Sequence, residues 1–118
     1  MIYRRVADII GTDREATGPG WKSRRLLLEE DGLGFSVHET TVEAGTELHL
    51  GYRNHSESVY CLAGRASVTD VLGGRVLELE EGSFYSVGIE EEHVLRIEED
   101  AKFVCIFEPA LIGQETAD

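Results

Sequence analysis

Residues 54–64 read Asn-His-Ser-Glu-Ser-Val-Tyr-Cys-Leu-Ala-Gly, a polar start followed by an apolar, β-branched and aromatic run that stops at a glycine. Residues 82–85, Gly-Ser-Phe-Tyr, have the same character, and a histidine follows at position 93. Such runs between glycine turns predict short strands. They bring a carboxylate (Glu57), a phenol (Tyr85) and an imidazole (His93) onto one β-rich framework. We interpret this donor set as a possible metal site inside a small barrel, with positions left open for a substrate.

The rest of the chain repeats the strand-and-turn pattern. Helical periodicity is confined to a short N-terminal turn at residues 6–10, and residues 11–20 form the one long irregular segment. Many short strands at regular spacing predict an all-β antiparallel sandwich or barrel. The predicted strands are 21–28, 35–42, 47–50, 58–62, 66–71, 75–79, 84–87, 93–97 and 102–107.

Length and charge narrow the class of protein. A chain of 118 residues suits a single domain spanning residues 1–118. The net charge of −12, from 23 acidic and 11 basic residues, argues against nucleic acid and anionic membranes as partners. Because no segment approaches the roughly 20 apolar residues of a membrane span, and the N-terminus lacks a signal-peptide core, we expect a cytoplasmic protein. Cys61 and Cys105 are then expected to be buried thiols.

Strand alternation predicts which side chains share a face. Trp21, Ser23 and Arg25 point one way on their strand. His38 and Thr40 share a face on the next strand, and Cys105 and Phe107 share one near the end of the chain. A polar and aromatic set of this kind suits the wall of a ligand pocket. Alternation alone leaves a second interpretation open, in which Trp21 closes the end of the barrel and Arg25 is solvated.

The spacing around the first motif is similar to that of the cupins, small double-stranded β-barrels with a glutamate, six residues and a glycine. The interval from Glu57 to Gly64 matches it. The histidine pair that cupins usually carry before this glutamate is absent, because Gly51 and Arg53 occupy those positions. His93, downstream of a glycine turn, fits the histidine of the second cupin motif.

Each of the three candidate ligands also has an ordinary structural explanation. Tyr85 could be a half-buried aromatic with a satisfied hydroxyl, His93 a core or surface histidine, and Glu57 a turn residue in an acidic chain. Taken together they favour a metal. Carboxylate and imidazole donors with open positions indicate a first-row transition metal, with iron a reasonable choice.

Longer stretches resemble the ectoine synthase family. They are GWKSRRLLL at residues 20–28, GFSVHETT at 34–41, YRNHSESVYC at 52–61 and VCIFEPALIGQE at 104–115. The resemblance covers essentially the whole chain. It implies a cupin barrel (a jelly roll) and an iron-dependent homodimer. The implied activity is that of a hydro-lyase that cyclises N-γ-acetyl-2,4-diaminobutyrate, with loss of water, to ectoine, a compatible solute made under osmotic stress.

The resemblance also implies roles for individual residues. Glu57, Tyr85 and His93 would hold Fe2+, although another divalent transition metal is possible. Tyr52 and Glu115 are the candidates for the general acid. The substrate contacts implied are Trp21, Ser23, Arg25, His38, Thr40, Cys105 and Phe107, several of which alternation had already placed on shared faces.

Two departures from the family pattern keep other functions open. Three glutamates at 90–92 precede His93, and the sequence stops at Asp118, short of the family's usual tail. They suggest as alternatives an enzyme acting on a related acyl-diamine or in the hydrolytic direction, or a non-catalytic cupin that binds a small molecule.

Overall fold

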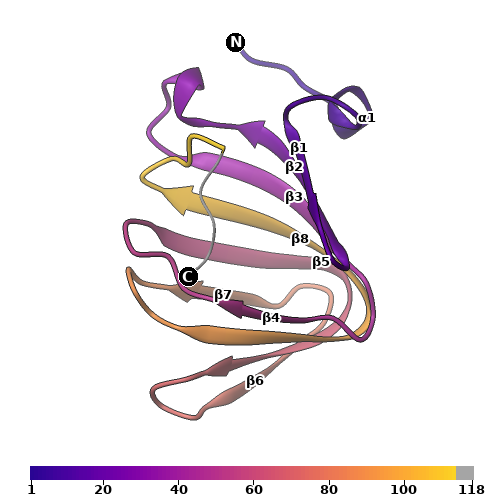
Figure 1. The fold of residues 1–118 in the computed structure, drawn as a ribbon, viewed down its shortest axis with the longest axis vertical. Helices are drawn as coiled ribbons and strands as arrows, with labels where there is room; N and C mark the ends of the chain where they lie inside the picture. Colours follow the sequence, from indigo (N-terminus) through magenta and orange to yellow (C-terminus); the bar gives the residue numbers. More distant parts are fainter. Residues whose placement is uncertain (114–118) are drawn as a thin grey trace.

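Antiparallel strands make up nearly all of the regular structure in the computed structural model, which describes residues 1–113 (Figure 1). A short helix and a 3-10 turn lie near the N-terminus. The elements in chain order are α1 (Val6–Ile9), β1 (Glu15–Gly18), β2 (Trp21–Leu27), η1 (Glu29–Asp31), β3 (Ser36–Val42), β4 (Glu47–Leu50), β5 (Ser56–Asp70), β6 (Val76–Leu79), β7 (Phe84–Val87) and β8 (His93–Glu108).

Two long strands, β5 and β8, run through both layers of the fold. Along one half they pair with each other and carry β7 and the β3-β2-β1 ladder. Along the other half they remain paired and carry β6 and β4. In Figure 1 the two layers come together at the right, where β5 and β8 bend, and spread apart toward the left. The all-β cupin-type jelly roll predicted from the sequence is confirmed.

The bend in β5 depends on Gly64. The strand ladder shifts register three times between Cys61 and Ala66, and Gly64 lies within this bulged stretch with a φ of 88°. A Cβ atom here would collide with the backbone carbonyl of Asp100 on β8. Only glycine combines that left-handed conformation with so close an approach of two backbones.

Three strand boundaries differ from the sequence prediction. Segments 58–62 and 66–71 are one strand, and so are 93–97 and 102–107, because β5 and β8 stay hydrogen-bonded to each other through the bend. Residues 11–20 are not wholly irregular, since β1 forms a hairpin with β2. The remaining predicted strands and the N-terminal turn appear within one or two residues of their expected ends.

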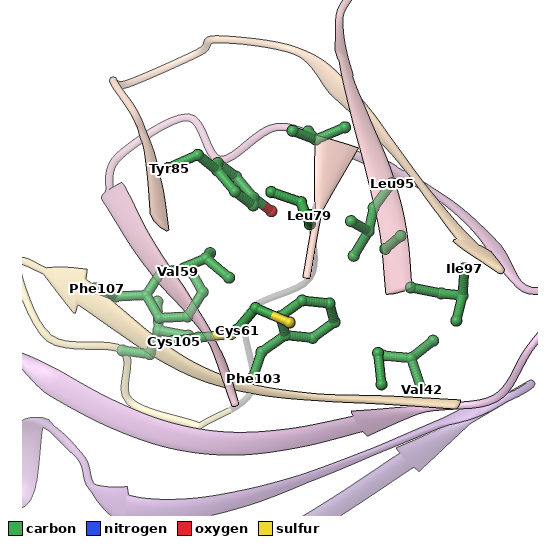
Figure 2. Close-up of a cluster of buried hydrophobic side chains, with 14 of the residues drawn as sticks. Val42, Val59, Cys61, Leu79, Tyr85, Leu95, Ile97, Phe103, Cys105 and Phe107 are labelled. Carbon is green, nitrogen blue, oxygen red and sulfur yellow. The ribbon is translucent and has the colours of Figure 1, made fainter. Parts of the chain in front are cut away.

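The core fills the space between the layers with side chains from β3, β5, β6, β7 and β8. Phe103 and Cys61 are at most 1% exposed, as expected for two inward-facing neighbours on paired strands. Both cysteines are buried free thiols, as predicted. Figure 2 shows that Tyr85 directs its hydroxyl into the same interior as Val59 and Leu79. Within the described residues, no helix is long and apolar enough to cross a membrane.

Candidate functional site

A cavity of about 310 Å³ opens between the two layers of the barrel and is called the cup below. Its wall combines aromatic and aliphatic side chains with a small number of polar groups, the composition typical of a small-molecule site. Ten of the twelve residues predicted for the site line it: Trp21, Ser23, Arg25, His38, Thr40, Tyr52, Glu57, Tyr85, Cys105 and Phe107.

The two other predicted residues lie elsewhere. His93 does not line the cup, but it is 2% exposed and its Nε2 atom lies 3.8 Å from Oε1 of Glu57. Glu115 falls outside the described residues. A second hollow, of about 460 Å³, lies where β1 ends, β2 begins and β3 ends. Exposed charged residues such as Lys22 and Glu43 line it. It contains none of the candidate metal ligands.

Strand register explains how the wall of the cup is assembled. Arg25 of β2 pairs with His38 of β3, which in turn pairs with Cys105 of β8. One step along, Ser23 pairs with Thr40. Because adjacent residues on paired strands point to the same face, all five side chains face the interior. The shared faces predicted from alternation are therefore confirmed for β2, β3 and β8.

Burial and a hydrogen bond give His93 a neutral ring with a lone pair on Nε2. Desolvation lowers its pKa, which favours the neutral ring, although the Glu91 carbonyl raises it somewhat. The Nδ1 atom lies 3.1 Å from that carbonyl oxygen. A carbonyl oxygen can only accept, so Nδ1 carries the proton and Nε2 carries the lone pair. The arrangement resembles the carbonyl-anchored histidines of metal sites.

Glu57 faces this lone pair with an unsatisfied oxygen. Among residues 1–113, Oε1 of Glu57 and Nε2 of His93 are the buried side-chain atoms that have no hydrogen-bond partner. Burial raises the pKa of Glu57 to about 7, an increase that the neighbouring Cys105 thiol partly offsets. Two adjacent buried atoms with unused lone pairs carry a desolvation cost that a cation at this point would relieve.

Tyr85 supplies the third oxygen or nitrogen donor near this pair. Its ring lies edge-on to His93 with the centroids 5.8 Å apart, and desolvation, with the Glu57 charge second, raises its pKa well above the ordinary value. Across the described part of the chain, no three histidine, cysteine or acidic side chains gather as a ligand set. A three-residue protein site at this position therefore needs the phenol.

Polar contacts also cross the upper wall of the cup. Oγ of Ser23 lies 3.4 Å from Nδ1 of His38 and accepts a 3.4 Å hydrogen bond from Nε of Arg25. Nη1 of Arg25 donates to the Gly113 carbonyl at 2.8 Å. The Phe107 ring packs edge-on against the rings of Tyr52 and His38, with centroids 4.8 and 5.2 Å apart. The wall thus presents a buried guanidinium beside aromatic surfaces.

Eight residues that line the cup were not predicted as site residues: Val42, Leu48, His49, Leu50, Val59, Leu95, Phe103 and Leu111. Leu111 is unusual among them because it follows the last strand. Ser36 was not predicted either; it does not line the cup, but it is fully buried and contacts His38. Ser36 lies two residues before His38 in the predicted strand 35–42, so a period of two puts both on one face; this was the one available signal. Nothing in the sequence indicated that the segment after β8 folds back to contact β3.

Comparison with known proteins agrees with this geometry. The family model described as "Ectoine synthase" matches residues 1–118. The chain is 49% identical to the L-ectoine synthase of Desulfosudis oleivorans, over all of this chain and 92% of that protein. It superimposes on the crystal structure of ectoine synthase from P. lautus with a TM-score of 0.91 and 39% identity, covering 96% of this chain and 81% of the other. An RmlC-like cupin from Shewanella frigidimarina shares the fold alone, at 21% identity and a TM-score of 0.70 over 81% and 82% of the two chains.

Proposed function

The chain belongs to the ectoine synthase family, and from this membership we propose how its cup carries out the ring closure of N-γ-acetyl-2,4-diaminobutyrate. Its function is that of an ectoine synthase, a hydro-lyase. The observation that carries the proposal is the buried, unpartnered pair of Glu57 and His93 beside a cavity walled by Arg25 and aromatic rings.

We propose that Glu57, Tyr85 and His93 hold a divalent metal, with iron the leading candidate. A carboxylate, a phenol and an imidazole suit a first-row transition metal, and the unused lone pairs of Glu57 and His93 support a cation between them. When bound, such an ion acts as a Lewis acid that stabilises negative charge on a carbonyl oxygen.

Arg25 is proposed to bind the carboxylate of the substrate. Arg25 is 8% exposed and lines the wall of the cup, where a charge-assisted hydrogen bond to a carboxylate is stronger than in water. Ser23 and the Gly113 carbonyl fix the direction of the guanidinium. The flexible substrate is thereby anchored at one end.

The aromatic side chains hold the rest of the substrate in a folded shape. Trp21, Tyr52 and Phe107 line the cup and offer flat apolar surfaces to a short methylene chain. Bringing the free amine to the acetyl carbon within one molecule can contribute on the order of 7–11 kcal/mol to lowering the barrier. Exclusion of water from the cup also favours the dehydrated product.

The reaction balances within the substrate. The α-amino nitrogen forms a bond to the acetyl carbon, and the acetyl oxygen leaves as water with two protons that come from the attacking amine. The remaining carbon–nitrogen double bond closes the amidine ring. A proton must reach the departing oxygen, and Tyr52 and Glu115 remain the two candidates for the group that delivers it.

We further propose that a second copy of the chain covers the outer face of β5, β7 and β8. Tyr60 pairs with Phe84 on this face, and Leu62 and Ile106 lie close by. Their exposed fractions are 45%, 62%, 37% and 40% in that order. A contiguous set of exposed apolar side chains on one sheet face is typical of an interface between subunits.

The proposal is tested by supplying Fe2+-loaded protein with N-γ-acetyl-2,4-diaminobutyrate and following ectoine by NMR. We expect ectoine from the wild type, little from Glu57→Ala, and wild-type amounts from Glu78→Ala, which removes an exposed carboxylate on β6. Absence of ectoine from the metal-loaded wild type would reject the proposed reaction.

A further inference from the structure

Ser36 carries a buried hydroxyl group that has no role in the proposed reaction. It is 0% exposed, at the start of β3. Its Oγ accepts a 3.1 Å hydrogen bond from the backbone N–H of Leu111, which is 75 residues away in the sequence. The same oxygen lies 3.1 Å from Nε2 of His38. Ser36 therefore joins the segment that follows β8 to a side chain on the wall of the cup.

The hydroxyl proton of Ser36 can be placed from these two contacts. The Leu111 N–H can only donate, so it occupies a lone pair of the oxygen. Within residues 1–113, the other partner of the hydroxyl is Nε2 of His38, and no solvent reaches a side chain so deeply buried. A buried hydroxyl without an acceptor is costly, so the O–H donates to Nε2.

That direction fixes the protonation of the imidazole. If Nε2 of His38 accepts, then the neutral ring carries its proton on Nδ1. Nδ1 lies 3.4 Å from Oγ of Ser23 and points its N–H at that oxygen. The hydrogen bond made by one ring nitrogen thus determines what the other nitrogen presents to the cup.

Ser23 then receives several donors at once. Besides Nδ1 of His38, Nε of Arg25 donates to its oxygen at 3.4 Å, and the Thr40 hydroxyl donates to it at 3.5 Å. These three long bonds share the two lone pairs of the oxygen, which leaves it no further capacity to accept. Because Ser23 lines the cup, its hydroxyl proton is available to donate to a ligand bound there.

We propose that Ser36 is a positioning residue that holds His38 as the Nδ1–H tautomer and so makes Ser23 a hydrogen-bond donor toward the substrate. The acceptor chemistry it fits is an oxygen with free lone pairs, such as a carboxylate or acyl oxygen. This role rests on the proposed function of the cup. The backbone N–H of Leu111, a residue beyond the last strand, thereby helps to decide whether Ser23 donates or accepts a hydrogen bond on the wall of the cup.

The tautomer of His38 can be measured without any turnover. Long-range proton–nitrogen NMR of the uniformly 15N-labelled, full-length, metal-free protein reports which nitrogen of each of the four histidines is protonated. His38→Gln identifies the His38 signals by their loss. We expect a protonated Nδ1 and an unprotonated Nε2. A proton on Nε2, alone or together with one on Nδ1, overturns the proposal, and this result does not depend on any Ser36 variant folding.

Kinetics of Ser36 variants give the second readout. Ser36→Ala should raise KM about tenfold, with a smaller effect on kcat, since it removes the group that orients one binding contact. Ser36→Thr keeps the hydroxyl and should restore most of the affinity. Ser83→Ala is the matched control, because its hydroxyl also accepts a backbone N–H, from Glu80, but Ser83 does not line the cup. An unchanged KM in folded Ser36→Ala overturns the proposal.

The two measurements separate this inference from the proposed function. A wild-type protein that makes no ectoine but holds His38 as the Nδ1–H tautomer rejects the reaction and supports the role of Ser36. Ectoine formation with the other tautomer supports the reaction and rejects the role of Ser36.

Discussion

Oε1 of Glu57 and Nε2 of His93 lie 3.8 Å apart in the interior of the barrel, too far for a hydrogen bond to each other. Neither atom has another hydrogen-bond partner among the residues described. They face each other from opposite layers of the fold, because Glu57 pairs with Phe107 at one end of the β5–β8 ladder and His93 pairs with Asp70 at the other. Buried polar atoms are rarely left unsatisfied, and the Glu91 carbonyl leaves the His93 lone pair facing the carboxylate. This relationship is the main support for a metal at the base of the cup.

Removing either member of this pair should abolish metal binding. We expect Glu57→Gln and His93→Gln to retain less than about a tenth of the wild-type metal after dialysis, because loss of a direct ligand costs at least as much as the 10- to 100-fold loss usual for its supporting groups. Tyr85→Phe should weaken binding in the same direction. Plasma emission spectrometry measures the metal content. His49→Gln is the control, since His49 lies at the exposed rim and pairs with Glu47; an equal loss in this variant would contradict the assignment.

Arg25→Lys should raise KM roughly ten- to one-hundred-fold. The lysine keeps the charge but loses the guanidinium geometry that Ser23 and Gly113 orient, and hydrogen bonds to charged groups contribute about 1.5–3 kcal/mol. Initial rates across substrate concentrations give the value. Arg24→Lys alters the neighbouring outward-facing residue, which pairs with Glu15. The KM of Arg24→Lys should stay at the wild-type value. Equal KM values for the Arg25→Lys and Arg24→Lys variants would show that Arg25 does not bind the substrate.

Gly64→Ala should be strongly destabilising, by more than about 3 kcal/mol, because the left-handed conformation and the collision with Asp100 add together. Gly74→Ala shares the positive φ, at 70°, but has open space around the added methyl group. It should cost only about 1 kcal/mol. Urea denaturation gives both free energies of unfolding. Similar costs at the two positions would show that the bend in β5 does not depend on close backbone contact.

Asp31 should make the stability of the N-terminal region depend on pH. Partial burial raises its pKa, but the hydrogen bonds from the Leu28 backbone and from Arg4 and Arg14 outweigh that effect, so the net pKa is lowered. An acid with a lowered folded-state pKa stabilises the protein above its unfolded pKa, and this contribution is lost as pH falls through the folded value. Asp31→Asn should therefore lower stability by about 1–2 kcal/mol at neutral pH and by little in strong acid.

Thermal unfolding at neutral pH and in acid tests this dependence. Asp13→Asn, at an exposed position without a hydrogen bond in the described structure, should match the wild type at every pH. A constant difference between Asp31→Asn and the wild type across the whole range would contradict the role given to the charge.

If the proposed subunit interface is correct, a charged residue introduced on the outer face of β7 should prevent two copies of the chain from associating. Phe84→Lys should convert a dimer to a monomer in analytical ultracentrifugation, because burying an unpaired ammonium is costly. Val76→Lys, which places the same charge on an exposed apolar position of β6, should leave the assembly unchanged. A monomeric wild type, or a dimer in both variants, would contradict this interface.

The fold class and most of the cup followed from the sequence because both rest on strand alternation. Trp21, Ser23 and Arg25 occupy one face of β2, as a period of two requires. The boundaries near Gly64 and Asp100 did not follow, because a glycine and a run of acidic residues look like turns until β5 and β8 are known to pair through them. The contact between Ser36 and Leu111 was also out of reach, since it links residues 75 positions apart after the last strand has ended. The metal, the general acid and the cytoplasmic location stay predictions.

Ectoine formation measured against bound iron per chain tests the central claim most directly. A series of samples from one preparation, reconstituted anaerobically to increasing occupancy, is assayed with N-γ-acetyl-2,4-diaminobutyrate. If Glu57, Tyr85 and His93 form the working metal site, activity should rise in proportion to occupancy and saturate at one ion per chain. Full ectoine formation in the metal-free protein, or none at one ion per chain, would contradict it.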